Sequence, residues 1–483
     1  MIKLDMSVVS TVFLALLFVN TVAAFITVFR KPRSIASVFA WMMTLVFIPG
    51  FGFLLYLFCG RGIDGEIIYK FSEHHQSRIN ELNQIIKVHN YSFPEHPYSD
   101  DNHLLERYFK NLDESPLTKG NQVQFYTDGK EKFAALFSDM QNAEDNIHVE
   151  YYSFFNDEIG GQFLDVLIEK AKQGVEVRLI FDPWGSPKAN RKFFQPLMDA
   201  GGKVVPFITS KNLIRNTRLN YHLHRKIVVI DGQIGWTGGF NVGDQYLGKK
   251  AKFGYWRDNH LRILGPAVYS LQNRFLMDWN SQHAIEIKYE AALFPMIETN
   301  GTIAAQVVTS GPDSEHEEIK ITYLKMINLA KKEILIQTPY YIPDESIHNA
   351  LKLALLSGVS VHLQIPNKPD HPLVYWATYS FAAELLAYGA VVETYEKGFM
   401  HAKTMIVDSG VVSIGSANID VRSFRLDFEV NTVVYDAKVA EEARQAFFAD
   451  SKDSEELTLE KYRNRRLLIK VKEGLARLVS PLL

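Results

Sequence analysis

Two apolar runs open the chain before any amphipathic pattern appears. Residues 6–29 contain no charged side chain, and residues 35–59 form a second uncharged, mostly apolar run. A helix rises about 1.5 Å per residue, so about 20 apolar residues suffice to cross a hydrocarbon core of about 30 Å. The pattern therefore predicts two transmembrane segments within residues 1–60 that together form a hairpin.

A short basic loop made by Arg30, Lys31 and Arg33 separates the two runs. A cleaved signal peptide is the competing interpretation of the first run, but its length and the second run count against it. The second run contains Pro49 and Gly50, so a kinked or re-entrant helix remains open there. Basic residues flank the hairpin on both sides in similar number, so the positive-inside rule does not orient it.

After a charged stretch at residues 61–119, which predicts a helical linker, the periodicity changes to strand–helix–strand units. In the first half a strand, an amphipathic helix and a buried parallel strand are predicted at residues 146–154, 158–173 and 175–181. The second half repeats this order at residues 333–341, 345–357 and 359–365. Duplicated units of this kind predict an α/β fold with mixed, mainly parallel sheets, in lobes at residues 120–300 and 301–456.

Two segments stand apart from the repeat. The first copy carries about ten extra residues, roughly 208–218, where Lys211, Arg215 and Arg218 could cover a site or contact lipid headgroups. The C-terminal stretch 457–483 is basic, and its apolar residues recur at helical spacing: Leu467, Leu468, Val471, Leu475 and Leu478. This pattern predicts an amphipathic helix, either on an anionic membrane surface or packed on its own domain.

One polar motif occurs in both halves, each time at the start of an apolar strand. The first copy, YHLHRKIVVIDGQIGWTGGFNVGD, carries His224, Lys226 and Asp231. The second copy, MHAKTMIVDSGVVSIGSANID, repeats the spacing with His401, Lys403 and Asp408. Asn241 and Asn418 follow at matching positions on the next turn. A single motif of three residues is a weak signal, but two registered copies are a strong one.

The spacing has a chemical meaning. Alternate residues of a strand share a face, so the histidine and the lysine project side by side. A lysine ammonium neutralises phosphate charge, while an imidazole attacks the phosphorus or transfers a proton. Asn241 and Asn418 would donate further hydrogen bonds to phosphate oxygens. The motif therefore predicts a site for an anionic substrate that carries phosphate.

Composition narrows the choice of function. The net charge of −3 counts against a general nucleic-acid binder, which is normally basic. The single cysteine, Cys59, excludes an intrachain disulfide and a cysteine-based metal site. His222 and His224 suggest a metal pair, but the neighbouring lysine would oppose a cation, so no metal is expected. A phosphate-binding glycine loop is also missing, and no cofactor is expected.

The doubled motif resembles the phospholipase D superfamily, and the chain resembles bacterial cardiolipin synthases over its full length. The resemblance implies duplicated phospholipase D-like lobes, preceded by the transmembrane hairpin, with both motifs at one pseudo-two-fold interface.

The implied catalytic residues are His224, Lys226, Asp231, His401, Lys403 and Asp408. It further implies that Asp258 and Glu429 orient the histidines, and that Asp231 and Asp408 have a more structural part. By family habit His224 is the nucleophile and His401 the acid and base, although the residues themselves do not distinguish these roles. Glu150, Tyr152 and Tyr340 are further candidates for the pocket wall.

The resemblance implies phosphatidyl transfer between two phosphatidylglycerol molecules, giving cardiolipin and glycerol at a bacterial cell membrane in which the chain is embedded as a multi-pass protein. Exchanging one phosphodiester for another is nearly neutral in free energy, which fits the missing nucleotide site. A phospholipase D-type hydrolase and a phosphatidyltransferase with another acceptor alcohol remain open. A nuclease fits the hairpin and the charge poorly, and intact motifs disfavour an inactive scaffold. The sequence leaves the oligomeric state and the side of the membrane undetermined.

Overall fold

The computed structural model describes residues 115–207, 221–282, 287, 290–314 and 316–480, and near the N-terminus residues 10–19, 22, 26, 35–48, 51, 52, 56 and 84. Within the two apolar runs, residues 10–19 are helical and helix α2 spans Ile35–Phe47. Across the described residues, no helix combines the length and hydropathy needed to cross a bilayer. The basic loop between the runs, nearly all of the 61–119 linker and the 208–218 loop lie outside the described residues.

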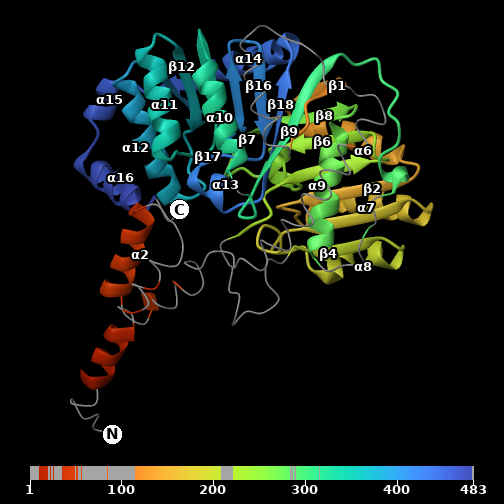
Figure 1. The fold of residues 1–483 in the computed structure, drawn as a ribbon, viewed down its shortest axis with the longest axis horizontal. Helices are drawn as coiled ribbons and strands as arrows, with labels where there is room; N and C mark the ends of the chain where they lie inside the picture. Colours follow the sequence, from red (N-terminus) through yellow and green to blue (C-terminus); the bar gives the residue numbers. More distant parts are fainter. Residues whose placement is uncertain are drawn as a thin grey trace.

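A single sheet of 15 strands runs through both halves of the described chain, which lie side by side in Figure 1. The first half supplies β1 (Thr118–Tyr126), β2 (Asn146–Tyr151), β3 (Glu176–Phe181), β4 (Lys203–Pro206), β5 (Lys226–Ile230), β6 (Ile234–Gly238) and β8 (His260–Leu264). The second half supplies β9 (Ile303–Ser310), β10 (Glu333–Gln337), β12 (Ser360–Pro366), β13 (Val391–Tyr395), β15 (Thr404–Val407), β16 (Val411–Gly415), β18 (Glu429–Tyr435) and β19 (Ser454–Glu456).

The strand order is symmetric about the antiparallel pair β1–β9. From this pair outward the first half runs β1-β8-β6-β5-β2-β3-β4, and the second half runs β9-β18-β16-β15-β10-β12-β13, with β19 added at the end. Each strand thus has a counterpart at the same distance from the centre. This order is that of two copies of one unit related by a pseudo-two-fold axis, which are fused edge to edge.

The sheet is mixed, as expected, but the parallel pairs are confined to its flanks. They are β2–β3, β3–β4, β10–β12 and β12–β13. The motif strands instead form hairpins, β5–β6 and β15–β16, and strands joined by a tight turn must be antiparallel. Asp231 and Asp408 begin these turns with φ of 52° and 51°. The expectation of mainly parallel pairing is therefore wrong for the central strands.

Helices cover the strand–helix–strand units where the sequence predicts them. Helix α7 (Glu158–Lys172) lies between β2 and β3, and helix α11 (Glu345–Leu356) lies between β10 and β12. Asp157 and Asp344 cap them by accepting backbone N–H groups of the first turn, which explains where both helices begin. Three further helices are α9 (Val268–Ser281) between β8 and β9, α12 (Pro372–Leu386) between β12 and β13, and α14 (Ala437–Ser451) between β18 and β19.

An apolar core continues across the seam between the halves. Ile227 and Leu261 of the first half share one buried cluster with Ile406 and Val430 of the second. Because the seam is filled by core side chains, the motif strands of both halves are held in a fixed relative position.

The C-terminal stretch forms two helices where a single one is predicted. Helix α15 covers Leu459–Arg463 and helix α16 covers Leu467–Val479. The side chain of Thr458 caps α15 by accepting the N–H of Lys461, and the chain turns at Asn464 before α16 begins.

Candidate active site

Two short parallel pairings bring each motif histidine beside a segment of the other half. Strand β14 (Gly398–Met400) pairs with β7 (Tyr255–Arg257), and the N–H of His401 donates to the carbonyl of Arg257 at 2.7 Å. In the same way Leu223 bridges Phe428, and the N–H of His224 donates to the Phe428 carbonyl at 2.9 Å. The residue after each partner segment therefore lies beside a histidine.

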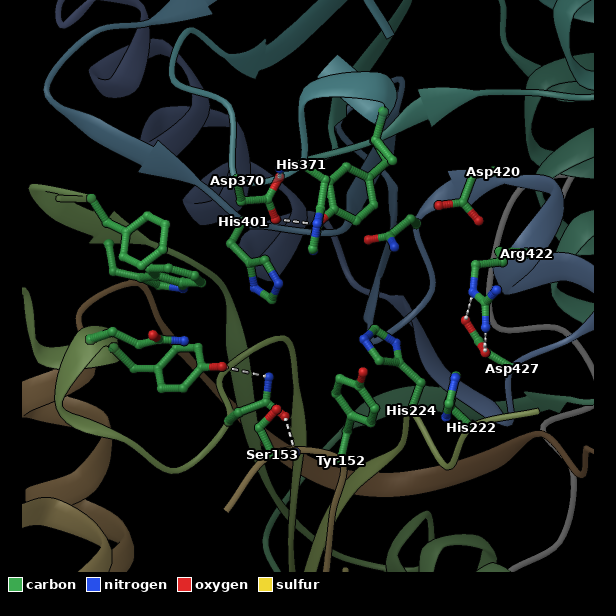
Figure 2. A pocket seen from close by; sticks show the side chains of 18 of the residues that line it. Tyr152, Ser153, His222, His224, Asp370, His371, His401, Asp420, Arg422 and Asp427 are labelled. Carbon is green, nitrogen blue, oxygen red and sulfur yellow. Dashed lines mark hydrogen bonds and ion pairs between the residues drawn. The ribbon is translucent and has the colours of Figure 1, made fainter. Parts of the chain in front are cut away.

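Those next residues are the two carboxylates, and each pairs with the histidine of the opposite half. His224 Nδ1 lies 2.8 and 2.9 Å from the two carboxylate oxygens of Glu429. His401 Nδ1 lies 2.5 Å from Asp258 Oδ2. A carboxylate bonded to Nδ1 fixes the tautomer in which Nε2 holds the lone pair. Figure 2 shows the two imidazole rings facing each other across the pocket.

Both histidines are held neutral near pH 7. Burial, and then the Lys226 ammonium, hold the pKa of His224 well below its usual range. Burial, followed by the charge of Lys403, lowers the pKa of His401 to about 4. Each ring therefore offers an unprotonated Nε2 to a ligand in the pocket.

The carboxylates are fixed by neighbours that differ between the halves. Glu429 is fully buried and accepts a hydrogen bond from Ser416 Oγ at 2.5 Å, while burial raises its pKa to about 7. Gly239 occupies the position that corresponds to Ser416. A Cβ at Gly239 would lie 1.9 Å from Asp258 Oδ1, so only glycine leaves room for this carboxylate.

The two motif lysines lie buried next to the histidines. Lys226 Nζ donates to the carbonyl of His224 and Lys403 Nζ donates to the carbonyl of His401, both at 2.5 Å. Burial lowers the pKa of Lys226 to about 7 and that of Lys403 to about 8. Neither lysine is among the residues that line the pocket, but both lie directly behind its histidines. Two buried cations there favour an anionic ligand, because its charge relieves their mutual repulsion.

Both motif asparagines line the pocket. Asn241 is oriented by the protein, since its Oδ1 accepts the N–H of Ser153 at 3.1 Å and its Nδ2 donates to the Tyr246 hydroxyl at 3.0 Å. The Oδ1 of Asn418 is buried and has no hydrogen-bond partner among the described residues. This oxygen is therefore an unpaired acceptor at the pocket wall.

Asp231 and Asp408, which the motif groups with the catalytic residues, lie away from the pocket at the far ends of β5 and β15. Asp231 accepts the backbone N–H groups of Glu144, Asp145 and Asn146. Asp408 accepts those of Lys331, Lys332 and Glu333. Their carboxylates therefore fasten each motif hairpin to the start of the neighbouring strand. Neither carboxylate is among the residues that line the pocket, and the hydrogen bonds of both go to backbone N–H groups.

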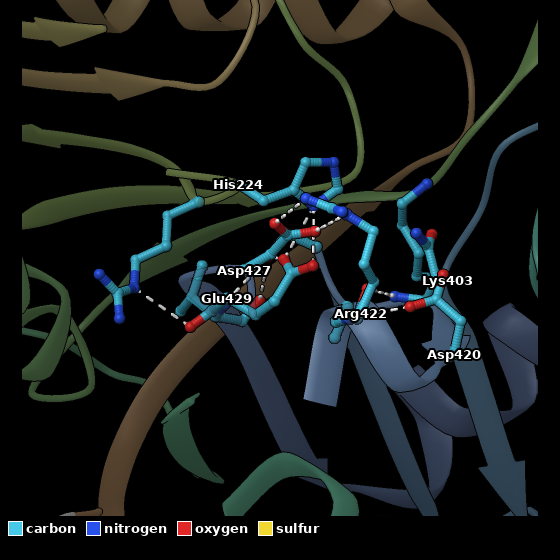
Figure 3. A network of polar contacts seen from close by, with 12 residues as sticks. His224, Lys403, Asp420, Arg422, Asp427 and Glu429 are labelled. Atoms are coloured by element: carbon cyan, nitrogen blue, oxygen red, sulfur yellow. Dashed lines mark hydrogen bonds and ion pairs between the residues drawn. The ribbon is translucent and has the colours of Figure 1, made fainter. Parts of the chain in front are cut away.

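The pocket has a volume of about 430 Å³ and two unlike walls. Around His401 the wall is aromatic, with the Trp256 ring centroid 5.0 Å from the imidazole. Around His224 it is charged: Asp420, Arg422 and Asp427 lie there, and Arg422 binds Asp427 through two hydrogen bonds of 3.2 Å (Figure 3). Burial raises the pKa of Asp420 to about 6.

The structure extends the set of site residues. Tyr152 and Tyr340 line the pocket as proposed from the sequence, whereas Glu150 does not and is wholly buried. The sequence analysis missed Trp256, Asp420, Arg422 and Asp427. Trp256 lies two residues before Asp258, and Asp427 lies two residues before Glu429. This closeness to the candidate carboxylates is the sequence feature that could have predicted both residues in the pocket.

Comparison with known proteins identifies related chains over nearly the full length. The family model described as cardiolipin synthase, PLD-like domain, matches residues 136–279 and 323–451. A second model, described as phospholipase D-nuclease N-terminal, matches residues 19–61. The cardiolipin synthase of Staphylococcus aureus is 46% identical over 481 residues, covering 99% of this chain and 97% of that protein. The cardiolipin synthase of Listeria monocytogenes is 45% identical over 485 residues, covering 99% and 100%.

A solved structure shares the fold. The crystal structure of phosphatidylserine synthase from Haemophilus influenzae superposes with a TM-score of 0.59 at 16% identity. The match covers 78% of this chain and 99% of that chain. At this identity the similarity concerns the fold alone.

Proposed function

The chain belongs to the cardiolipin synthase family of phospholipase D-like proteins, and on this basis we propose that it transfers a phosphatidyl group from one phosphatidylglycerol to another, yielding cardiolipin and glycerol. The observation that carries the proposal is the pair of facing imidazoles, each bonded through Nδ1 to a buried carboxylate of the opposite half. Two Nε2 atoms on opposite sides of one pocket suit an in-line displacement at phosphorus, in which the unprotonated Nε2 of one ring attacks and the other ring, protonated when the anionic substrate binds, gives up its Nε2 proton.

In the first step, His224 Nε2 attacks the phosphorus of the donor lipid and the bond to the glycerol oxygen breaks. His401 gives its Nε2 proton to that oxygen, so glycerol leaves as a neutral alcohol and a phosphatidyl-histidine diester remains. Burial lowers the pKa of His401 to about 4 in the empty site, and a bound phosphodiester anion raises it again by attraction to the imidazolium.

In the second step, the neutral His401 accepts a proton from a glycerol hydroxyl of the second phosphatidylglycerol. The resulting alkoxide displaces His224 from phosphorus, and both histidines return to their starting states. Lys226, Lys403, Asn241 and Asn418 hold the non-bridging oxygens as negative charge develops in the two transition states. The assignment of His224 as nucleophile follows the family resemblance, since both histidines have the same kind of partner.

We further propose that residues 6–29 and 35–59 form a transmembrane hairpin that embeds the chain in the bacterial cell membrane. Two uncharged runs of sufficient length support it, as does the separate N-terminal family model over residues 19–61. Anchoring would keep the pocket at the level of the lipid headgroups on which it acts.

The test is to incubate the purified chain in detergent with phosphatidylglycerol alone and to follow lipids and glycerol by mass spectrometry. The proposal predicts cardiolipin and glycerol in equal amounts, both lost in His224→Ala. Phosphatidic acid with glycerol would show that water is the acceptor, and would replace the proposal with a hydrolase. A second acceptor alcohol such as ethanolamine is then added in excess. The transferase proposed here continues to form cardiolipin, whereas an enzyme that prefers the added alcohol forms the corresponding phosphatidyl ester instead.

A further inference from the structure

Helix α16 presents its apolar side chains outward. Five of them are exposed by between 49% and 76%: Leu467, Leu468, Val471, Leu475 and Leu478. At about 100° per residue, these five fall within an arc of about 100° on the helix surface. A helix that only covers a soluble domain turns such a stripe toward the core, so this stripe faces something other than water.

The opposite side of α16 is fixed to the protein by charged groups. Glu473 is buried and accepts hydrogen bonds from Arg465 Nε at 2.7 Å and from the Tyr462 hydroxyl at 3.1 Å. Arg477 forms an ion pair with Glu384 of helix α12, and Ala476 is fully buried against the same helix. A rotation that hid the leucines would break these contacts and expose Glu473. The outward orientation is therefore built into the fold.

Basic residues border the apolar stripe. Lys470 and Lys472 are exposed and lie about 100° to either side of its centre. Arg463 and Arg466 are exposed just before the helix. Lysine side chains in this position can reach past an apolar face to the phosphates of anionic lipids while the leucines enter the acyl region.

Helix α12 links the helix that carries the stripe to the pocket wall. Helix α16 packs along α12, and α12 contributes Val374 to the pocket wall while His371 precedes its first turn and lines the same wall. Leu373, between them, is 50% exposed. In Figure 1, α16 lies at the same end of the molecule as the apolar helix α2.

We propose that α16 docks on an anionic lipid bilayer, with its five leucine and valine side chains at the boundary between headgroups and acyl chains. Docking holds the α12 edge of the pocket at the level of the headgroups, so that a lipid phosphate enters without leaving the bilayer. The choice of an anionic surface follows from the basic border, and it agrees with the phosphatidylglycerol of the proposed function.

The test uses the full chain in nanodiscs of phosphatidylcholine and phosphatidylglycerol. Cys59→Ser removes the single native thiol, and a fluorophore is attached through Leu475→Cys or, as the matched control, through Leu356→Cys. Leu356 is 72% exposed at the end of α11, outside the stripe. Doxyl-labelled lipid is expected to quench the fluorophore on α16 strongly and the fluorophore on α11 little. Equal quenching of both, or crosslinking of two copies through Leu475→Cys without quenching, overturns the proposal.

A second measurement separates docking from chemistry. The pair Leu468→Ser and Leu475→Ser is expected to lower turnover of bilayer phosphatidylglycerol several-fold, while turnover of dissolved short-chain phosphatidylglycerol stays unchanged. The control pair Leu353→Ser and Leu356→Ser leaves both rates unchanged. If the wild-type chain shows lipid quenching but no turnover, the proposed function is contradicted and docking is not. If the stripe variant loses turnover equally on bilayer and dissolved phosphatidylglycerol, docking is contradicted and the proposed function is not.

Discussion

At the residue scale, the central feature is that each motif histidine takes its carboxylate partner from the other half of the chain. The hydrogen bond from His224 to Glu429 joins residues 205 positions apart, and that from His401 to Asp258 joins residues 143 positions apart. A carboxylate buried next to an imidazole is costly unless it is bonded, and each is bonded here by the ring it orients. Arg225 supports the arrangement, since its guanidinium donates to the backbone carbonyl of Glu429 at 3.1 Å.

Replacing this carboxylate by its amide tests its role. Glu429→Gln keeps the size of the side chain but removes the charge and allows an amide N–H to face Nδ1, which favours the wrong tautomer of His224. We expect kcat to fall by about 10³-fold with the fold retained. Lipid turnover and circular dichroism on the same preparation check this, and activity within a few-fold of wild type would refute the orienting role.

The buried lysines predict a pH dependence. A lowered pKa means that the ammonium is present at lower pH and is lost as pH rises through the shifted value. Because burial lowers the pKa of Lys226 to about 7 and that of Lys403 to about 8, kcat/KM for an anionic lipid should fall as pH rises through this range. The phosphodiester itself does not titrate there. A kcat/KM profile that stays flat to alkaline pH would show that the lysines remain charged in the free enzyme.

At the element scale, local patterns predicted the repeated units well. The strands and helices at β2–α7–β3 and β10–α11–β12 begin and end within a few residues of their expected limits, because caps and hydrophobic periodicity are local. The direction of the motif strands was not predicted, since it depends on the short hairpin turns at Asp231 and Asp408. The pairing of each carboxylate with the opposite half was also not predicted, because no local pattern encodes a contact between distant segments.

The hairpin turns give a prediction about stability. Asp231→Ala removes the carboxylate that accepts three backbone N–H groups. It is expected to destabilise the protein by about 1–3 kcal/mol. Since Asp231 does not line the pocket, kcat per folded molecule should change little. Thermal unfolding in detergent and active-site titration check the two parts. A large loss of kcat at full stability would instead place Asp231 in the catalytic machinery.

At the scale of the whole molecule, the continuous sheet and the shared core make one site from two halves of one chain. This arrangement predicts that two inactive variants do not rescue each other. Mixing His224→Ala with His401→Ala should restore no activity, since both histidines of each pocket come from the same chain. Recovery of a substantial fraction of wild-type activity would mean that halves are exchanged between copies.

The most direct measurement is to locate the covalent intermediate. A phosphatidyl donor with a p-nitrophenyl leaving group needs no general acid, so it should load the nucleophile even when the other histidine is missing. After quenching of His401→Ala in alkaline denaturant, which preserves the acid-labile N–P bond, peptide mass spectrometry is expected to find the phosphatidyl group on His224, and His224→Ala should carry none. An adduct on His401 of the His224→Ala variant, or the absence of any adduct from all variants and the wild type, would contradict the account.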